Sequence, residues 1–500
     1  MIDLRAAKTL EILSEAGDQI VQQAGRAAGN LLFIISDEHQ ARALSCAGHP
    51  IVRTPHIDAL AERGNRFEAA YTPCPICVPA RASLATGRYV HDIRYWDNAT
   101  AYDGRVPGWG VRLQAANVRM EAIGKLHYRN REDPTGFDAQ HRPMHIWNGI
   151  GQVWGAVRDP IPGPRDDIVR FEQLGAGYSK YNAYDEAVRD QAIAWIRNHA
   201  NDKRPWMLFV GFVAPHFPLI APQFYIERYP PDQMPLPALR RRGGYSRHPW
   251  VDAQERLMPT DAEFGMDDAK RRRAISAYFA LCTMLDDHVG AICAALGGAG
   301  LAETTTVICT SDHGEALGQR DHWGKSNLYS ECTQVPLVVA GPDAPRGHGC
   351  KTPVNLIDLA PTFLAAFGLS DPQLPGRSLF DVAREPFDSN RAVFSEYHAV
   401  GAPSGAFMLR KGRWKYHEYI GFEPELFDLE SDPDEATNVA NDPGCAAHVV
   451  RLRKELRRIV DPEAADRQAK TDQRALVEGF GGREAAFRMG TEGPTPAPNA

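Results

Sequence analysis

The sequence predicts an α/β fold with a mostly parallel central sheet, followed by a smaller C-terminal α+β subdomain with an antiparallel sheet. Four segments have the apolar or β-branched character of strands, at 30–36, 117–124, 204–218 and 304–314. Longer segments between them, such as 183–199 and 268–297, predict helices. Strands that alternate with helices favour a parallel sheet that is covered on both faces.

The predicted strands end in or lead directly into titratable residues. The residues at these ends, in chain order, are Asp37, Lys125 with His127, His216, and Asp312 with His313. Ligands of parallel sheets bind at the carboxyl ends of the strands. We therefore expect the four clusters to converge on one site, although they are distant in the sequence.

The chain divides into four expected parts. Residues 1–29 predict a helical leader, because the apolar positions between 4 and 25 recur at helical spacing. Residues 30–385 form the expected main domain, and 386–460 contain short strand-like runs that predict the antiparallel subdomain. Residues 461–500 are charged and then Gly/Pro-rich, which predicts a partly disordered tail, although 464–488 keep some helical periodicity through Ala475, Leu476, Phe480 and Phe487.

Composition argues against several classes of partner. The formal net charge is −7, and no basic stripe with interleaved aromatic residues is present, so we expect no nucleic-acid partner. No apolar run of the ~20 residues that a membrane helix needs stands out, and the N-terminus lacks a signal-peptide core. Nine scattered cysteines suit a reducing compartment. We therefore expect a cytoplasmic protein with no membrane partner.

The stretch CPICVPARASLATGR, residues 74–88, contains a C-x-x-C pair, Cys74 and Cys77. A redox pair should directly follow the first strand of a small βαβ unit, but this pair comes about 40 residues later in a Pro-rich loop. A zinc site would need a second C-x-x-C, and the sequence has none. Pro79 suits a first helical turn, which would set Cys77 at a helix N-terminus where free N–H groups attract an anion.

Cys77-Val78-Pro79-Ala80-Arg81, followed by Thr86-Gly87, resembles the C-x-P-x-R signature of the sulfatases in the alkaline phosphatase-like superfamily. The resemblance covers roughly 30–440 and implies the α/β/α sandwich of that superfamily. In the family, the cysteine is oxidised to formylglycine by a formylglycine-generating enzyme before the chain folds. The aldehyde hydrates, one hydroxyl attacks sulfur, and the other later loses its proton as sulfate leaves. The resemblance thus implies that Cys77 is the precursor of a nucleophile and that Cys74 is incidental.

The resemblance also implies a metal site. Asp37, Asp312 and His313 match family ligands that would hold one divalent ion together with residue 77. Glu38 stands where many members have Asp and some have Gln, so it is a further candidate ligand. The Asp-His pair is the pattern of the branch that contains arylsulfatases, choline sulfatases and phosphonate monoester hydrolases. Oxygen ligands with one imidazole suit Ca²⁺ or Mn²⁺ better than a structural zinc.

Further residues match the family's substrate-handling groups. Gly124-Lys125-Leu126-His127 resembles the G-K-x-H element, in which Lys125 would bind the sulfate oxygens and His127 would take the proton from the diol. His216 and Lys325 match the pair that faces the ester oxygen. Arg81 would hold the diol oxygen and the metal's carboxylates. Asn98, in YWDNA, would contact the transferred group, whereas His322 would support the site without touching substrate.

The resemblance implies a metal-dependent sulfatase, a sulfuric ester hydrolase acting on aryl or small alkyl sulfates. The alternatives are a phosphonate monoester or phosphodiester hydrolase on the same site, a choline sulfatase, and an unmodified protein that only binds anionic esters. The presence of both Lys125 and His127 favours sulfate. Tyr95, Trp96 and Tyr102 either form a cage for a quaternary ammonium or phenol, or pack in the core. Members of the branch assemble through terminal extensions, so we expect 461–500 to be an oligomerisation arm of a homo-oligomer.

Overall fold

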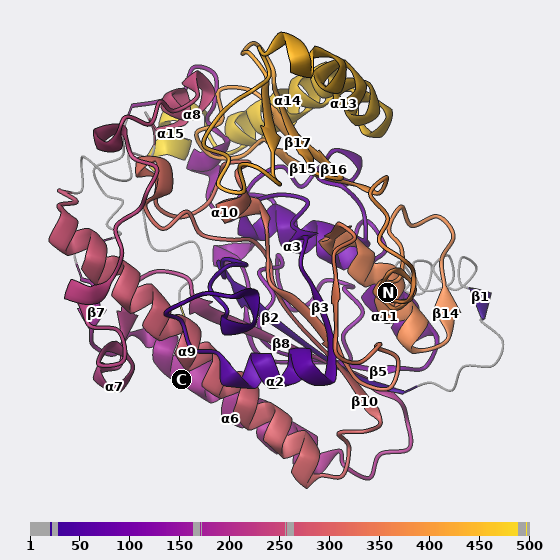
Figure 1. Cartoon of the computed structure of the whole chain (residues 1–500). Coiled ribbons are helices and arrows are strands. Elements are labelled where there is room, and N and C mark those ends of the chain that lie inside the picture. The colour runs from indigo at the N-terminus through magenta and orange to yellow at the C-terminus, as the bar shows by residue number, and fades with distance from the viewer. Residues whose placement is uncertain are drawn as a thin grey trace.

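The computed structural model describes residues 21–22, 29–163, 171, 173–255, 257, 265–488 and 497. Figure 1 shows a central twisted sheet with helices on both faces and, above it, a second sheet that carries the C-terminal helices. The predicted α/β/α sandwich and the antiparallel C-terminal sheet are therefore both confirmed.

The central sheet has eight strands. In spatial order they are β12 (His348–Cys350), β3 (Gly64–Phe67), β11 (Leu337–Ala340), β10 (Thr305–Ser311), β2 (Asn30–Asp37), β8 (Trp206–Pro215), β5 (Arg119–Lys125) and β6 (Ala139–Met144). The run from β10 to β6 is parallel throughout, whereas β11 pairs antiparallel with both of its neighbours. All four strands predicted from the sequence lie side by side in the parallel run.

Two apolar layers enclose this sheet. One face packs against α2 (Pro55–Arg63), α6 (Lys180–Asn198) and α9 (Asp268–Gly298), and the other against α3 (Cys77–Thr86), α5 (Trp109–Ala115) and α11 (Leu359–Ala366). Because side chains alternate along a strand, Leu32 and Ile34 of β2 join the first layer, while Leu31 and Phe33 join the second. Burial on both faces explains why the strand-forming segments are so apolar.

Shorter elements connect these layers. They are α4 (Val90–Ile93), α7 (Gln223–Ile226), α8 (Pro249–Gln254), α10 (Ser330–Thr333), α12 (Leu379–Arg384), and the two-residue strand pairs β4 (Ala70–Tyr71) with β13 (Val354–Asn355) and β7 (Gly175–Ala176) with β9 (Ile220–Ala221).

Helix α9 is more apolar than the sequence analysis suggests. By length and composition it could cross a membrane. In the fold, most of its apolar stretch is buried inside the protein, against α6 and β8. A buried core helix of a globular domain can have the same length and apolar composition, so the position of α9 in the core accounts for its hydropathy.

The C-terminal subdomain is a four-stranded antiparallel sheet. Its strands are β15 (Ala392–Tyr397), β16 (Ala406–Lys411), β17 (Trp414–Tyr419) and β18 (Glu425–Asp428), paired in chain order. Helix α13 (Ala446–Ile459) covers one face through Leu452 and Leu456. The other face packs on residues of the main domain, such as Tyr71 and Trp250.

The ends of the chain differ from expectation. The predicted helix over 4–25 lies outside the described residues except at Val21–Gln22. These two residues form a short strand (β1) that pairs with β14 (Leu369–Ser370), so the helix prediction is wrong there. The helical periodicity noted over 464–488 is confirmed, because α14 (Pro462–Gly479) and α15 (Arg483–Phe487) are helices, and the expected disorder does not extend to these helices. Both pack on their own chain, where Leu476 and Phe480 meet Val153 and its neighbours. The sequence does not reveal this, because the segment's few apolar residues find partners only in the folded main domain. The boundaries of the four parts remain predictions.

We predict that ending the chain after residue 460 lowers the midpoint of thermal unfolding, because it removes side chains that are buried in the intact protein, such as Ala465 and Gln473. A chain ended after 488, which keeps both helices, is the control. Light scattering on the same two proteins tests the oligomerisation arm. An unchanged midpoint after truncation at 460 would show that the packing of α14 contributes nothing to stability.

Candidate active site

The predicted strand ends meet at one edge of the central sheet. Strands β10, β2, β8 and β5 are consecutive neighbours and run parallel, so their carboxyl ends lie together. Asp37 ends β2, Lys125 ends β5, and His216 directly follows β8. Asp312 directly follows β10, and its Oδ1 accepts a hydrogen bond from the Glu38 N–H at 3.2 Å.

A pair of glycines lets β5 approach β8 closely at this edge. Gly124 has φ +94°, and a Cβ there would lie 2.2 Å from the carbonyl oxygen of Gly211. A Cβ on Gly211 would in turn lie 2.1 Å from the carbonyl oxygen of Lys125. No side chain fits either position. The approach sets the Lys125 Nζ 2.6 Å from Oδ2 of Asp37, in a buried ion pair.

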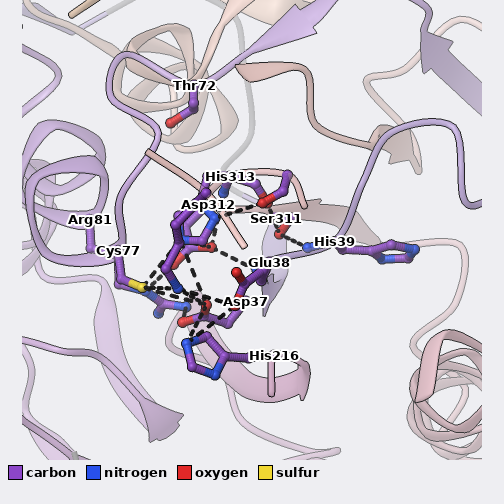
Figure 2. Close-up of polar contacts among 12 residues, drawn as sticks. Asp37, Glu38, His39, Thr72, Cys77, Arg81, His216, Ser311, Asp312 and His313 are labelled. Atoms are coloured by element: carbon purple, nitrogen blue, oxygen red, sulfur yellow. Dashed lines mark hydrogen bonds and ion pairs between the residues drawn. The ribbon is translucent and has the colours of Figure 1, made fainter. Parts of the chain in front are cut away.

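Helix α3 delivers the signature residues. It begins at Cys77 after an extended Ile76, as the position of Pro79 predicted, and ends at Gly87 in the left-handed region with φ +68°. Every residue of the helix is buried. Arg81 lies about one turn beyond Cys77, and its Nε donates to Oδ2 of Asp312 at 2.8 Å (Figure 2).

The sulfur of Cys77 contacts several residues of the cluster (Figure 2). Its Sγ is 3.2 Å from Nε2 of His313, 3.6 Å from Oδ1 of Asp37 and 3.1 Å from Nζ of Lys325. Cys74 does not join the cluster, and all nine cysteines are free. The geometry therefore supports neither a disulfide nor a zinc half-site at residues 74–77.

The donor set suits a divalent cation. Ligand atoms of Asp37, Cys77, Asp312 and His313 all lie within 4.8 Å of one another, and all four residues are buried. Because a carbonyl can only accept, the His313 Nδ1–H donates to Gly314 O at 3.0 Å, which leaves Nε2 free to coordinate. Such a bond on the second ring nitrogen is the usual support of a metal-binding imidazole.

Glu38 lies beside this group. Its Oε2 is 3.1 Å from Nζ of Lys325 and 3.3 Å from Nε2 of His216, while its buried Oε1 has no hydrogen-bond partner. A buried carboxylate oxygen without a partner is costly unless a cation fills the gap. The residues present therefore fit a divalent ion held by carboxylates and one imidazole.

The neighbouring carboxyl groups of Asp37 and Glu38 respond differently to burial. Burial alone would raise the pKa of Asp37, but Lys125, His216, Lys325 and Arg81 outweigh it and hold that pKa well below its usual value. Burial raises the pKa of Glu38 to about 8, since Lys325 compensates only in part. Asp37 is thus the permanent anion of the pair, whereas Glu38 depends on a nearby cation for its charge.

Burial also sets the protonation of the other groups. It raises the pKa of the Cys77 thiol to about 12, with Asp37 adding to the effect. It lowers the pKa of His216 well below the usual value, and the charge on Lys325 lowers it further. The pKa of His127 falls in the same way, through burial and then the charge on Lys125. Both histidines are therefore neutral.

The loop that carries Lys325 is anchored from several sides. His322, the residue expected to support the site without touching substrate, lies between the Lys325 carbonyl, 2.6 Å from its Nε2, and Glu255, 2.7 Å from its Nδ1. A carbonyl only accepts, so Nε2 carries the proton in the first of these bonds. The Ser326 N–H donates to Pro75 O at 3.0 Å, which ties this loop to the segment before Cys77.

Asn98 lies at the start of α3, where its Oδ1 accepts a hydrogen bond from the Val78 N–H at 3.2 Å. Its neighbour Asp97 is buried and accepts a hydrogen bond from Nε2 of Gln473, on α14, at 2.7 Å. The Oε1 of Gln473 in turn accepts from Nη1 of Arg158 at 2.8 Å. A helix near the C-terminus therefore holds the loop that meets the signature helix.

The aromatic residues near Asn98 were expected either to form a ligand cage or to pack in the core, and the structure shows core packing. Tyr95 and Tyr102 are 0% and 1% exposed and pack edge to face at 6.0 Å. Trp96 is 3% exposed, and its Nε1–H donates to Oδ2 of Asp472 at 2.8 Å. They form no cage for a ligand.

All of the residues predicted for the site lie in this region, and their catalytic roles remain predictions. The sequence analysis missed two supporting residues. Asp185 of α6 accepts hydrogen bonds from the Val213 and Ala214 N–H groups at 2.9 and 2.7 Å and so fixes the strand end before His216. Gln473 is the other. Neither sits in a motif, and only the fold brings them near the site.

Comparison with known proteins places the chain among relatives of defined activity. The family model described as Sulfatase matches residues 29–369, and the model described as N-sulphoglucosamine sulphohydrolase, C-terminal, matches 318–461. The chain is 30% identical to the choline-sulfatase of Rhizobium meliloti (strain 1021), over 83% of each chain. It is 28% identical to human arylsulfatase K, over 88% of this chain and 84% of the relative. The phosphonate monoester hydrolase SpPMH from Silicibacter pomeroyi superposes with a TM-score of 0.69 at 26% identity, over 86% of this chain and 94% of that one.

We predict that Gln473→Ala lowers kcat/KM about tenfold, because it leaves the buried Asp97 carboxylate without its amide donor and loosens the loop that carries Asn98. Gln468→Ala, an exposed glutamine on the same helix, is the matched control. Steady-state kinetics and thermal unfolding, measured together, separate the two effects. If kinetics are unchanged while the protein is destabilised, Gln473 supports the fold but does not position the site.

Proposed function

The chain belongs to the sulfatase family, and from this premise we propose that it hydrolyses sulfate monoesters of aryl or small alkyl alcohols through a nucleophile made from Cys77. One observation carries the proposal. The side chain of residue 77 lies within 3.6 Å of a carboxylate, an imidazole and an ammonium group that come from three other segments of the chain. This is the environment that a nucleophile for an anionic ester needs.

We propose that Cys77 acts as formylglycine, after oxidation by a formylglycine-generating enzyme. The unmodified thiol is poorly suited to the reaction, since burial raises its pKa to about 12. The hydrated aldehyde would offer two hydroxyls at the place of the sulfur. One would attack the sulfate ester, and the other would lose its proton when sulfate is expelled.

Asp37, Asp312, His313 and the modified residue 77 would hold one Ca²⁺ or Mn²⁺, with Glu38 as a further ligand. The ion, when bound, supplies Lewis-acid chemistry: it acidifies the attacking hydroxyl and offsets the charge of the substrate. Arg81 has its own task, because its contact with Asp312 and its approach to Asp37 at 3.5 Å keep the two carboxylates aimed at one point. The unpaired Oε1 of Glu38 supports its inclusion.

The remaining cations match a monoanionic substrate. Lys125 and Lys325 add two positive charges beside residue 77. Together with Arg81 and a divalent ion they leave a modest positive excess over the carboxylates of Asp37, Glu38 and Asp312. A sulfate monoester carries one negative charge and a phosphate monoester nearly two. We therefore propose that sulfate monoesters are the preferred substrates.

Proton transfer falls to the two histidines. His127 is neutral, so it would accept the proton of the second hydroxyl as sulfate leaves. His216 donates its Nδ1–H to the Phe217 carbonyl at 2.7 Å, and its Nε2 faces Glu38. Once its Nε2 has gained a proton, His216 would stabilise the departing alkoxide or phenoxide together with Lys325. Asn98 would contact the transferred group beside the N-terminus of α3.

Two alternatives on the same site have support of their own. The likeness to a phosphonate monoester hydrolase favours phosphonate monoesters or phosphodiesters, which are also monoanions. The choline-sulfatase relative favours choline sulfate. The first alternative is weakened by Lys125 and His127, which are suited to expelling sulfate, and the second by the burial of Tyr95, Trp96 and Tyr102.

A hydrolysis panel decides among these functions. An aryl sulfate, choline sulfate, an aryl phosphonate monoester and an aryl phosphate would be compared by kcat/KM on metal-loaded protein. We expect the aryl sulfate to have the highest kcat/KM, the phosphonate monoester a lower one and the phosphate the lowest, whereas a lead for choline sulfate would favour the second alternative. A phosphonate monoester that exceeds every sulfate would replace the proposal by its first alternative, and binding without turnover of any ester would refute an enzymatic role.

We predict that Asp312→Asn removes bound metal and activity together, because it discharges a ligand and breaks the ion pair with Arg81. Metal content by mass spectrometry and turnover are measured on the same sample. Asp232→Asn is the control, since Asp232 is exposed and belongs to none of the groups of possible metal ligands among the described residues. Full metal occupancy in the Asp312 variant would contradict the ligand assignment.

We predict that active protein carries formylglycine at residue 77 while Cys74 stays a thiol. The mass of the peptide that contains both residues reports this directly, and Cys74 serves as its internal control. Pro79→Ala, which alters the C-x-P-x-R context, should leave the thiol unmodified and the protein inactive. A fully active protein with both thiols intact would rule out the nucleophile proposed here.

We also propose that the protein works in the cytoplasm as a homo-oligomer. The nine free cysteines support a reducing compartment. Cell fractionation and light scattering, respectively, test these two proposals.

A further inference from the structure

A cavity of about 790 Å³ lies between the main domain and the C-terminal sheet, away from the catalytic cluster. Its walls come from the segments around Arg42 and Arg66 of the main domain and from the β16–β17 hairpin and α13 of the C-terminal subdomain. No residue of the catalytic cluster lines it. Its volume is within the range of about 300–1,000 Å³ that is usual for small-molecule sites.

The lining is strongly basic. It contains seven arginine and lysine side chains but only two carboxylates, Glu68 and Glu430. Four of the cations form ion pairs with acidic side chains. These pairs are Arg42 with Asp434, Arg66 with Glu68, Lys411 with Glu455, and Arg413 with both Asp428 and Glu430. The other three, Lys351, Arg410 and Arg451, have no carboxylate within ion-pair distance in the described part of the chain. The cavity therefore has an excess of positive charge that the protein itself does not neutralise.

Arg410 is the most constrained of these three. It is half-buried, its Nη1 donates to the Tyr71 hydroxyl at 2.7 Å, and its guanidinium lies 5.3 Å from the centre of the same ring. Tyr71 is fully buried, so this contact fixes the guanidinium in place. A guanidinium held in one orientation loses little entropy on binding, and its planar fork matches the oxygens of a sulfate or phosphate group.

Aromatic rings stand beside these cations. Trp414 stacks on His448, with ring centroids 4.3 Å apart and planes inclined by 25°. Nδ1 of His448 accepts a hydrogen bond from Nη2 of Arg451 at 3.2 Å, which links the stacked pair to a second of these cations. Phe387, also in the lining, is 59% exposed, one of the few large apolar side chains so exposed among the described residues. Flat apolar rings next to charged donors suit a ligand that has a ring as well as an anionic group.

We propose that this cavity is a second ligand site, which binds a small ring-bearing molecule that carries one or two sulfate or phosphate groups. Arg410 and Arg451 would bind the oxyanion, and Trp414 with Phe387 would contact the ring. The proposal does not depend on the reaction at residue 77, because no group is shared between the two sites.

Calorimetric titration of the full-length protein with glucose 6-sulfate and glucose 6-phosphate tests this site, with glucose as the neutral probe. Both anionic probes should bind saturably and glucose should not. The ratio of the two affinities identifies which oxyanion the cavity prefers. Loss of one charged donor should weaken binding about tenfold or more, so Arg410→Ala and Arg451→Ala should each show this loss.

Two matched variants separate the cavity from other binding. Arg458→Ala removes an exposed arginine of α13 outside the lining, and Lys125→Ala disables the anion site beside residue 77. Binding that survives both of these changes but is weakened by Arg410→Ala and Arg451→Ala supports the proposal. The proposal is overturned if the anionic probes do not bind at millimolar concentration, if glucose binds as well as they do, or if the affinity falls only in Lys125→Ala. Arg451 is exposed, so its variant remains informative even where Arg410→Ala fails to fold.

Discussion

The arrangement at the carboxyl edge of the central sheet depends on one buried guanidinium. Asp37 and Asp312 end neighbouring strands, so their carboxylates are forced together in a region from which water is excluded. Arg81 lies between them, with Nε on Asp312 at 2.8 Å and Nη2 near Asp37 at 3.5 Å, and a third hydrogen bond runs from its Nη1 to the Lys125 carbonyl at 2.9 Å. Removing one partner of such a buried pair typically costs about 3–5 kcal/mol, because the other charge stays behind unpaired. The contact therefore couples the placement of three strand ends to a single side chain.

That contact also determines where the side chain of residue 77 lies. Arg81 and Cys77 share a helix and are four residues apart, so fixing the guanidinium fixes the first turn of α3 as well. The complete burial of α3 leaves the helix no freedom to shift, and Gly87 lets the chain turn away at its end in a left-handed conformation. The close approach of Gly124 and Gly211 likewise fixes the position of Lys125, at the end of β5. Backbone packing, rather than side-chain flexibility, thus establishes the distances around residue 77.

The sequence predicted these features well because each has a local signature. Buried parallel strands are apolar along their whole length, and the polar residue at each strand end marks the carboxyl edge, so the sequence alone groups Asp37, Lys125, His216 and Asp312. The contribution of α14 could not be predicted in this way. Gln473 and Asp466 are polar residues in a charged helix, and their burial against Asp97 and Arg158 follows only from tertiary packing. The two-residue strand at Val21–Gln22 was missed for a related reason, since its partner β14 lies far along the chain, at Leu369–Ser370.

The polar contacts of α14 bear on how the active site is organised. Asp97 is 2% exposed, and an isolated carboxylate at that depth would be strongly disfavoured. Burial accordingly raises its pKa, and the hydrogen bond from Gln473 opposes that rise. The amide group of Gln473 is itself held in place, because its Oε1 accepts a hydrogen bond from Arg158 and its Nε2 donates to the backbone carbonyl of His398. Docking of α14 therefore supports the loop that presents Asn98 to the start of α3, through a residue that lies 376 positions further along the chain than Asp97.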